Sequence, residues 1–79
     1  MALFYFDHYD GEMLLDSDGT ELETLDDAKI AAATSLSEMA KRELTGTRRE
    51  LAIEVSDTDH KPLFGVSLFY EMINAPDQN

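Results

Sequence analysis

The chain has 79 residues, of which 43% are hydrophobic, and its formal net charge at pH 7 is −11. Affinity for a nucleic-acid backbone depends on Lys and Arg that displace counterions, so this charge disfavours nucleic acid as a direct ligand. The absence of cysteine excludes disulfides and thiolate metal sites. No apolar run approaches the roughly 20 residues that cross a bilayer, and no signal-like segment opens the sequence. We therefore expect a cytoplasmic protein that does not enter membranes.

The first predicted strand runs from Ala2 to Tyr9, where large apolar and polar side chains alternate. Both of its faces carry aromatic or aliphatic groups, which indicates a central strand. Asp10-Gly11 then predicts a tight hairpin, because both central positions of a type I′ turn require positive φ. A short return strand is expected at Met13 to Leu15, followed by a polar turn from Asp16 to Thr20 and a lead into a helix.

One long amphipathic helix is predicted from Thr24 to Leu44. Thr24 and Asp27 have the spacing of a capping box, in which hydroxyl and carboxylate each accept from a backbone N–H of the first turn. Gly46 predicts the end of the helix. Apolar residues recur at helical spacing and form a single stripe: Leu25, Ala28, Ala32, Leu36 and Met39.

The C-terminal part of the chain predicts two more strands. Leu51 to Val55 alternates apolar with polar residues, and after a turn from Asp57 to Lys61 the last strand begins at Pro62. We expect an α+β fold with a mostly antiparallel sheet, in the order β-β-α-β-β, and the helix on one face. Residues 1–73 form the single domain, and residues 74–79 are predicted to be a flexible C-terminal tail.

A single helix covers only one face of such a sheet. The residues expected to face it are apolar: Phe4, Phe6, Leu51, Ile53, Val55, Val66 and Leu68. Four large side chains then lie on the opposite face: Leu3, Tyr5, Leu63 and Phe69. Contiguous exposed apolar area on a small domain marks an association surface, so these four are the predicted binding residues for another protein or for a second copy in a homodimer. The alternative is that they are scattered singly and tolerated.

Acidic residues suggest metal binding in the acidic turn and at two histidine clusters. Spacing argues against the first, and the predicted topology argues against a site shared by the two clusters. In the acidic turn, Gly19 as the sixth position of an EF-hand loop puts Leu14 first and Leu25 twelfth, where carboxylates are required. Two clusters combine histidine with carboxylates and resemble zinc or manganese ligands: His8 with Asp7 and Asp10, and His60 with Asp57 and Asp59. The predicted topology places them at opposite ends of the sheet, so a shared site is not expected. A weak divalent-metal binder stays an alternative function.

Catalytic motifs are missing from the sequence. There is no cysteine, no Ser in a Gly-x-Ser-x-Gly turn and no glycine-rich phosphate loop. We therefore expect neither an enzyme nor a cofactor, and no residue is predicted to be catalytic. The expected function is a non-catalytic protein-interaction or self-association module.

Several short motifs together resemble a known family. They are Phe4-Tyr5-Phe6-Asp7 with the following Asp10-Gly11, the Asp16 to Gly19 stretch, and the strand Leu51 to Val55. The chain is similar to a family of short, uncharacterised alphaproteobacterial proteins grouped as a domain of unknown function. That resemblance implies no activity, cofactor or catalytic residue. The family usually has Asp-Gly where this chain has Asp59-His60, which puts a shared tight turn in question.

The helix start Thr24-Leu25-Asp26-Asp27-Ala28 also resembles HicB-type antitoxin domains, which run from an opening strand through an Asp-Gly turn to such a helix. Those domains mask a small basic toxin, and a chain of charge −11 suits a basic partner. An antitoxin-like role that neutralises a small basic protein is therefore the main alternative function.

Overall fold

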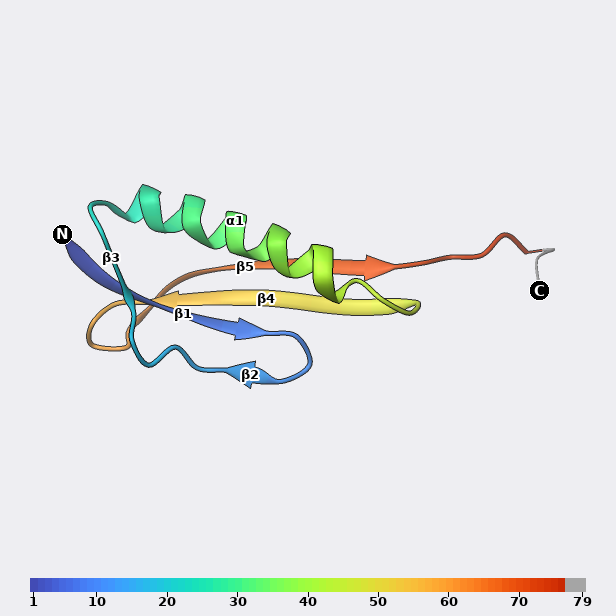
Figure 1. Cartoon of the computed structure of the whole chain (residues 1–79), viewed down its shortest axis with the longest axis horizontal. Helices are drawn as coiled ribbons and strands as arrows, with labels where there is room; N and C mark the ends of the chain where they lie inside the picture. Colours follow the sequence, from blue (N-terminus) through green and yellow to red (C-terminus); the bar gives the residue numbers. More distant parts are fainter. Residues whose placement is uncertain (77–79) are drawn as a thin grey trace.

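The structure is a computed structural model that describes residues 1–76. Five strands and one helix follow each other in the order β1, β2, β3, α1, β4, β5 (Figure 1). Their bounds are Ala2–Tyr9 for β1, Met13–Leu14 for β2, Thr20–Leu22 for β3, Leu25–Glu43 for α1, Arg48–Ser56 for β4 and Pro62–Glu71 for β5. The α+β fold, with α1 packed on a mostly antiparallel sheet, confirms the prediction. Among the described residues, no helix is both long and apolar enough to cross a lipid bilayer.

The sheet has the order β2-β1-β4-β5, and β3 pairs with β1 on the same side as β2. The structure adds one strand to the predicted order β-β-α-β-β, since Thr20–Leu22 pairs antiparallel with β1 instead of only leading into the helix. Three residues are too few to show an alternating pattern. β4 also begins at Arg48, before the predicted Leu51, because its polar first residues pair with the end of β5.

The N-terminus of α1 has the hydroxyl half of the predicted capping box. Thr24 has extended backbone angles, and its hydroxyl oxygen accepts a hydrogen bond of 3.1 Å from the N–H of Asp27. Lys41 and Arg42 occupy the last turn, where cations complement the negative end of the helix dipole. The helix ends at Glu43, and Gly46 follows with a φ of 73°. Local sequence signals therefore set both ends of α1.

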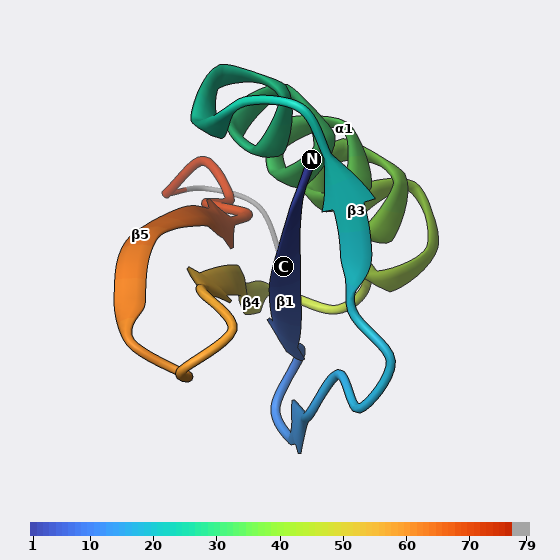
Figure 2. The ribbon, with the colours of Figure 1, turned by 90° about the vertical axis from the view of Figure 1, so that its left-hand side faces the viewer.

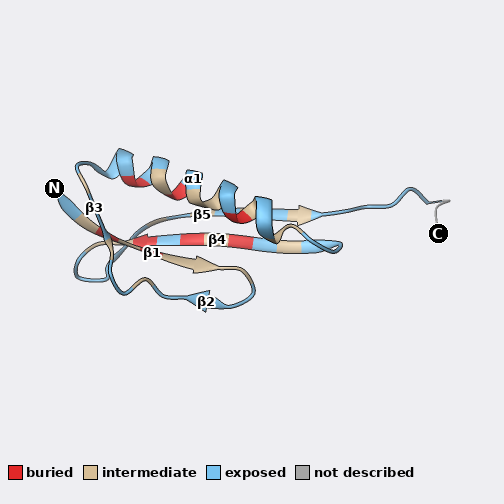
Figure 3. Ribbon diagram, viewed as in Figure 1, coloured by how far each residue is buried: buried red, intermediate tan, exposed pale blue. Residues whose placement is uncertain are grey.

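The core lies between α1 and the middle of the sheet (Figure 3). Ala28 and Ala32 are fully buried, and their small side chains let the helix axis approach β4 closely. The largest fully buried side chains all come from β4, namely Leu51, Ile53 and Val55. Phe4, Phe6 and Met39 complete the buried set. The predicted stripe is buried only in part, because Leu25 at its start is 42% exposed.

The helix does not cover the whole sheet. In the end-on view it lies above β1 and β4, while β5 forms the lateral margin (Figure 2). The helix-facing residues of β5, Phe64, Val66 and Leu68, are therefore only half-buried, in contrast to their fully buried partners on β4. Within residues 1–76, no strand pairs with the outer edge of β5.

We predict that Ile53→Ala lowers the free energy of unfolding by about 3 kcal/mol, because it leaves a cavity at the centre of the core. Ile30→Ala is the matched control, since Ile30 is 66% exposed on the solvent side of α1. This control should change stability by less than about 0.5 kcal/mol. Urea unfolding of both variants measures the two values, and equal losses would contradict the assigned core.

Candidate functional site

The sheet face that α1 does not cover, called here the outer face, carries Leu3, Tyr5 and Phe69 of the four predicted binding residues. Side chains alternate along a strand, so these three point away from the buried Phe4, Phe6 and half-buried Val66. Leu63 lies at a β-bulge, where the pairing shifts from Val55–Phe64 to Ser56–Pro62. Their exposure differs. Leu63 is 41% and Phe69 56% exposed, whereas Leu3 and Tyr5 are half-buried.

Loops cover the two residues of β1. Leu3 lies under the turn before β3, so closely that a Cβ on Gly19 would be 2.9 Å from its Cδ1. The ring of Tyr5 stacks on the ring of His60, with centroids 4.7 Å apart and an interplanar angle of 25°. Leu3 and Tyr5 thus lie partly under other parts of this chain, and Leu63 and Phe69 are the freer members of the set.

Phe69 lies apart from the other three. Ser56 of β4 pairs with both Tyr5 and Pro62, which places Leu63 near Tyr5. Phe69 is six residues further along β5, a distance of about 20 Å. Gly65 and Ser67 occupy the outer face between them. In one copy of the chain, the four residues therefore do not form one continuous apolar patch.

The surroundings of Phe69 are partly charged. The guanidinium carbon of Arg48 lies 5.6 Å from the ring centroid of Phe69, within range of a cation–π contact. The same guanidinium forms an ion pair of 3.3 Å with Glu71. These contacts hold Phe69 and the end of β5 against the start of β4.

The turn between β4 and β5 is tight although it lacks glycine. The carboxylate of Asp57 accepts hydrogen bonds of 2.9 Å from the N–H groups of Asp59 and Lys61. His60 has a φ of 60°, in the left-handed region that favours glycine. His60 thus adopts the backbone conformation that favours glycine, and its ring stacks on Tyr5.

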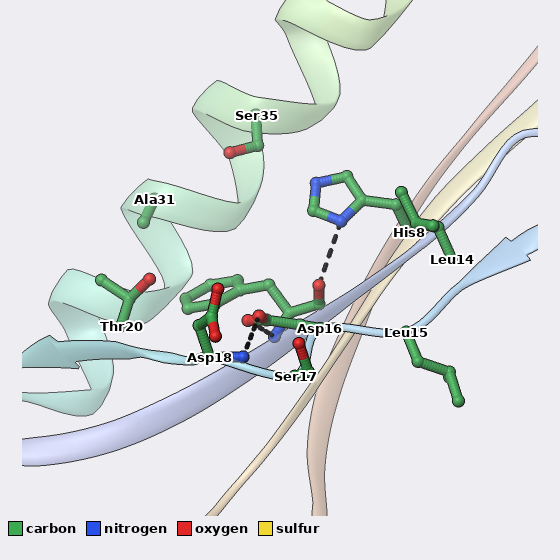
Figure 4. A pocket seen from close by; sticks show the side chains of 10 residues that line it. His8, Leu14, Leu15, Asp16, Ser17, Asp18, Thr20, Ala31 and Ser35 are labelled. Atoms are coloured by element: carbon green, nitrogen blue, oxygen red, sulfur yellow. Dashed lines mark hydrogen bonds between the residues drawn. The ribbon is translucent and has the colours of Figure 1, made fainter.

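A cavity opens on the other face of the sheet, between α1 and the turn that joins β2 to β3. Its volume is about 570 Å³. Figure 4 shows the side chains that line it: Phe6, His8, Leu14, Leu15, Asp16, Ser17, Asp18, Thr20, Ala31 and Ser35. Nδ1 of His8 lies 3.0 Å from the carbonyl oxygen of Phe6. A carbonyl only accepts, so Nδ1 carries a proton and donates it in this bond, which leaves Nε2 as the other polar atom of the ring.

Asp16 organises the turn beside this cavity. Its Oδ1 accepts hydrogen bonds from the N–H groups of Asp18 at 3.1 Å and Gly19 at 3.0 Å. Its Oδ2 accepts from the N–H of Phe6 at 3.1 Å, in the gap of the sheet between β2 and β3. Burial raises the pKa of Asp16, but these three N–H groups and the nearby His8 lower it, and the net pKa lies below its usual value. The carboxylate thus takes the place of a pairing strand at this point.

The two histidine clusters do not converge. His8 is on the helix side of the sheet and lines the cavity, whereas His60 stacks on Tyr5 on the outer face. In the part of the chain that the structure describes, no three residues of His, Cys, Asp or Glu are grouped as metal ligands would be. A site shared by His8 and His60 is therefore not formed.

Sequence patterns did not indicate that β5 is an edge strand. A signal was present in its composition, since no residue from Pro62 to Tyr70 is charged. The opposite edge of the sheet is divided between β2 and β3, which have two and three residues and are joined by the acidic turn at Asp16. Long, uncharged edge strands are the ones open to further pairing. The outer edge of β5, with Leu63 and Phe69 beside it, is thus the main candidate site.

These features define a small α+β domain with one helix on an antiparallel sheet and an exposed apolar edge strand. The family model of the domain of unknown function DUF6894 matches residues 3–69, which is most of the chain. The chain belongs to this family, and the predicted membership of an uncharacterised family is confirmed. No curated protein and no solved structure matches the chain. The likeness to HicB-type antitoxins stays a prediction.

We predict that Asp16→Asn destabilises the fold at pH 7 by about 1 kcal/mol, because an amide nitrogen cannot accept from the N–H of Phe6. The pKa of Asp16 is lower in the folded chain than its usual value of 3.8, so the ionised form stabilises the fold. This contribution is complete above the unfolded pKa and is lost as the pH falls through the folded pKa. Urea midpoints of both proteins from neutral to acid pH should converge, and a constant difference would contradict this.

We predict that His60→Gly is more stable than His60→Ala by about 1 kcal/mol, because glycine adopts positive φ without steric cost. Both variants lose the stack on Tyr5, so the difference between their stabilities measures the cost of positive φ at residue 60. Thermal unfolding of the two variants measures it. Equal stabilities would show that the backbone at residue 60 is free to relax.

Proposed function

We propose that this chain is a non-catalytic binding module that associates with protein through β5. The observation that carries the proposal is an edge strand whose free side is flanked by exposed apolar side chains. Phe69 lies on its outer face, the 41% exposed Leu63 lies at its bulge, and Met72 and Ile73, which are 55% and 81% exposed, follow its end. Backbone groups of an unpaired edge supply affinity in strand addition, and alternate side chains supply specificity.

The acidic segment supports a second candidate. Residues 1–28 contain nine acidic and no basic residues, and Asp16 and Asp18 present their carboxylates beside the cavity. A small basic protein would be attracted by this charge at low salt. In the antitoxin-like role, the small basic protein would contact the turn between β2 and β3, and the edge of β5 would stay free.

We predict that a photoreactive benzoyl-phenylalanine at position 69 crosslinks to protein in cells, because Phe69 borders the proposed contact edge. The matched control carries the same group at position 30, where Ile30 is exposed on the far side of α1. Adducts at position 69 and not at position 30 support the proposal, whether the captured chain is this protein or another.

The same experiment separates the two candidates. A probe at the exposed Ser17 in the acidic turn should capture a small basic protein if the chain acts like an antitoxin. Adducts at position 17 alone would favour that role over association through β5. The absence of adducts at position 69 overturns the proposed use of β5.

A further inference from the structure

Beyond the bulge at Leu63, the backbone of β5 has one bonded and one free side. Residues 64–71 pair with β4 in a single register, which Met72 continues by donating a hydrogen bond of 2.8 Å to the carbonyl of Thr47. Hydrogen-bonded pairs alternate along an antiparallel ladder, so the even-numbered residues here direct their N–H and C=O toward β4. The residues between them direct these groups outward, where a further strand can pair: Gly65, Ser67 and Phe69.

The two faces of this free segment differ in chemistry. Its helix-side residues are apolar and half-buried: Phe64, Val66 and Leu68. On the outer face, Gly65 carries no side chain, and its partner in β4 is Glu54. A Cβ on Gly65 would be 3.9 Å from Cγ of Glu54, so the glutamate side chain borders the gap that the glycine leaves. The outer face is therefore open from the edge of the sheet to the side chain of Glu54.

The carboxylate of Glu54 lacks a counter-charge. Within residues 1–76 it takes part in no ion pair. Its partner on the other side, in β1, is the acidic Asp7, whose carboxylate accepts a hydrogen bond of 2.9 Å from the N–H of Asp16. Like charges directly opposite each other destabilise a sheet. A cation placed over Gly65 would offset this repulsion.

From these observations we infer that the strand which pairs with β5 alternates apolar and basic residues and places a Lys or Arg opposite Gly65. Its apolar residues cover the flank of β5 that α1 leaves half-buried, and its basic side chain crosses the gap to Glu54. Neighbouring strands are about 4.8 Å apart, so the Cα atoms of the two charged residues are separated by roughly 10 Å, which their extended side chains span. This inference rests on the proposed binding function and names the chemistry of its partner.

A second copy of this chain does not supply the required cation. No residue from Pro62 to Glu71 is basic, so a β5 strand added at this edge brings none to Glu54. Lys61 precedes the bulge, and both its N–H and its carbonyl are bonded to Asp57 within the turn. The partner strand therefore belongs to a different, basic protein.

The test uses a short synthetic peptide that alternates Val and Lys, added to the isotope-labelled full chain. Hydrogen exchange at the N–H groups of Gly65, Ser67 and Phe69 should slow about tenfold, because these groups become hydrogen-bonded. The N–H groups of Val66 and Leu68 already face β4 and serve as the internal reference. A peptide that alternates Val and Glu is the matched control and should leave exchange unchanged.

Two pairs of variants test the contact with Glu54, and titration calorimetry measures their affinity for the Val–Lys peptide. Glu54→Gln should weaken binding about threefold, whereas Glu38→Gln, which changes the net charge equally on the exposed side of α1, should not. Gly65→Val closes the gap and should weaken binding to a similar extent. The added Cβ would lie 3.6 Å from the carbonyl oxygen of Ile53, an ordinary contact, so this variant should fold. Ser67→Val is its matched control.

The outcomes separate the inference from the proposed function. Equal protection by the two peptides, or equal weakening by Glu54→Gln and Glu38→Gln, overturns the basic partner and leaves strand addition at β5 standing. Protection in the free chain that rises with its concentration would assign the edge to a second copy and overturn the inference. A lack of protection by the Val–Lys peptide overturns it as well, and adducts from position 69 then decide whether the proposed function stands.

Discussion

The structure depends on the contact between the small residues of α1 and the middle of β4. Ala28 and Ala32 bring the helix close enough for Leu51, Ile53 and Val55 to be fully excluded from water. A chain of this size has few other residues to bury, so this contact supplies most of the hydrophobic stabilisation. A single helix of 19 residues does not cover the full width of the sheet. Contacts other than those with α1 must therefore hold the strands at the two edges of the sheet.

The two margins use different solutions. On the side of β1, polar bonds replace regular pairing, since the carboxylate of Asp16 accepts from the N–H of Phe6 where neither β2 nor β3 reaches. On the side of β5, the strand is long, with a β-bulge near its start, and its helix-facing side chains stay half-buried. The two edges of one sheet are therefore held by different kinds of contact.

Local signals predicted most of the elements from the sequence. The cap at Thr24 and the alternation around Ile53 depend only on near neighbours, and both appear as expected. The strand Thr20–Leu22 was missed because its position depends on Asp16 reaching a backbone group ten residues earlier, which no periodic pattern records. The start of β4 was predicted too far along the chain for a similar reason. Its first residues are polar and pair with the end of β5, so they show no apolar alternation.

The candidate site was likewise predicted only where local patterns determine it. Alternation placed Phe69 on the outer face, but it showed neither the β-bulge at Leu63 nor that Gly19 and His60 cover Leu3 and Tyr5, because those contacts join segments far apart in the chain. It also gave no strand order, and the outer position of β5 follows only from that order. Which residues share a face is thus readable from sequence, whereas which of them stay accessible is not.

The two edges of the sheet differ in length and charge, and this difference determines whether an assembly of the chain can grow by strand pairing. An edge that can pair repeatedly leads to open-ended fibrils, and many β proteins must block it. Here the edge formed by β2 and β3 is short, interrupted and acidic, so it offers little for another strand to extend. Occupation of β5 would use the one long edge that the described chain presents. A copy of the chain joined there would present only its own short, acidic edge, so no filament could elongate from such an assembly.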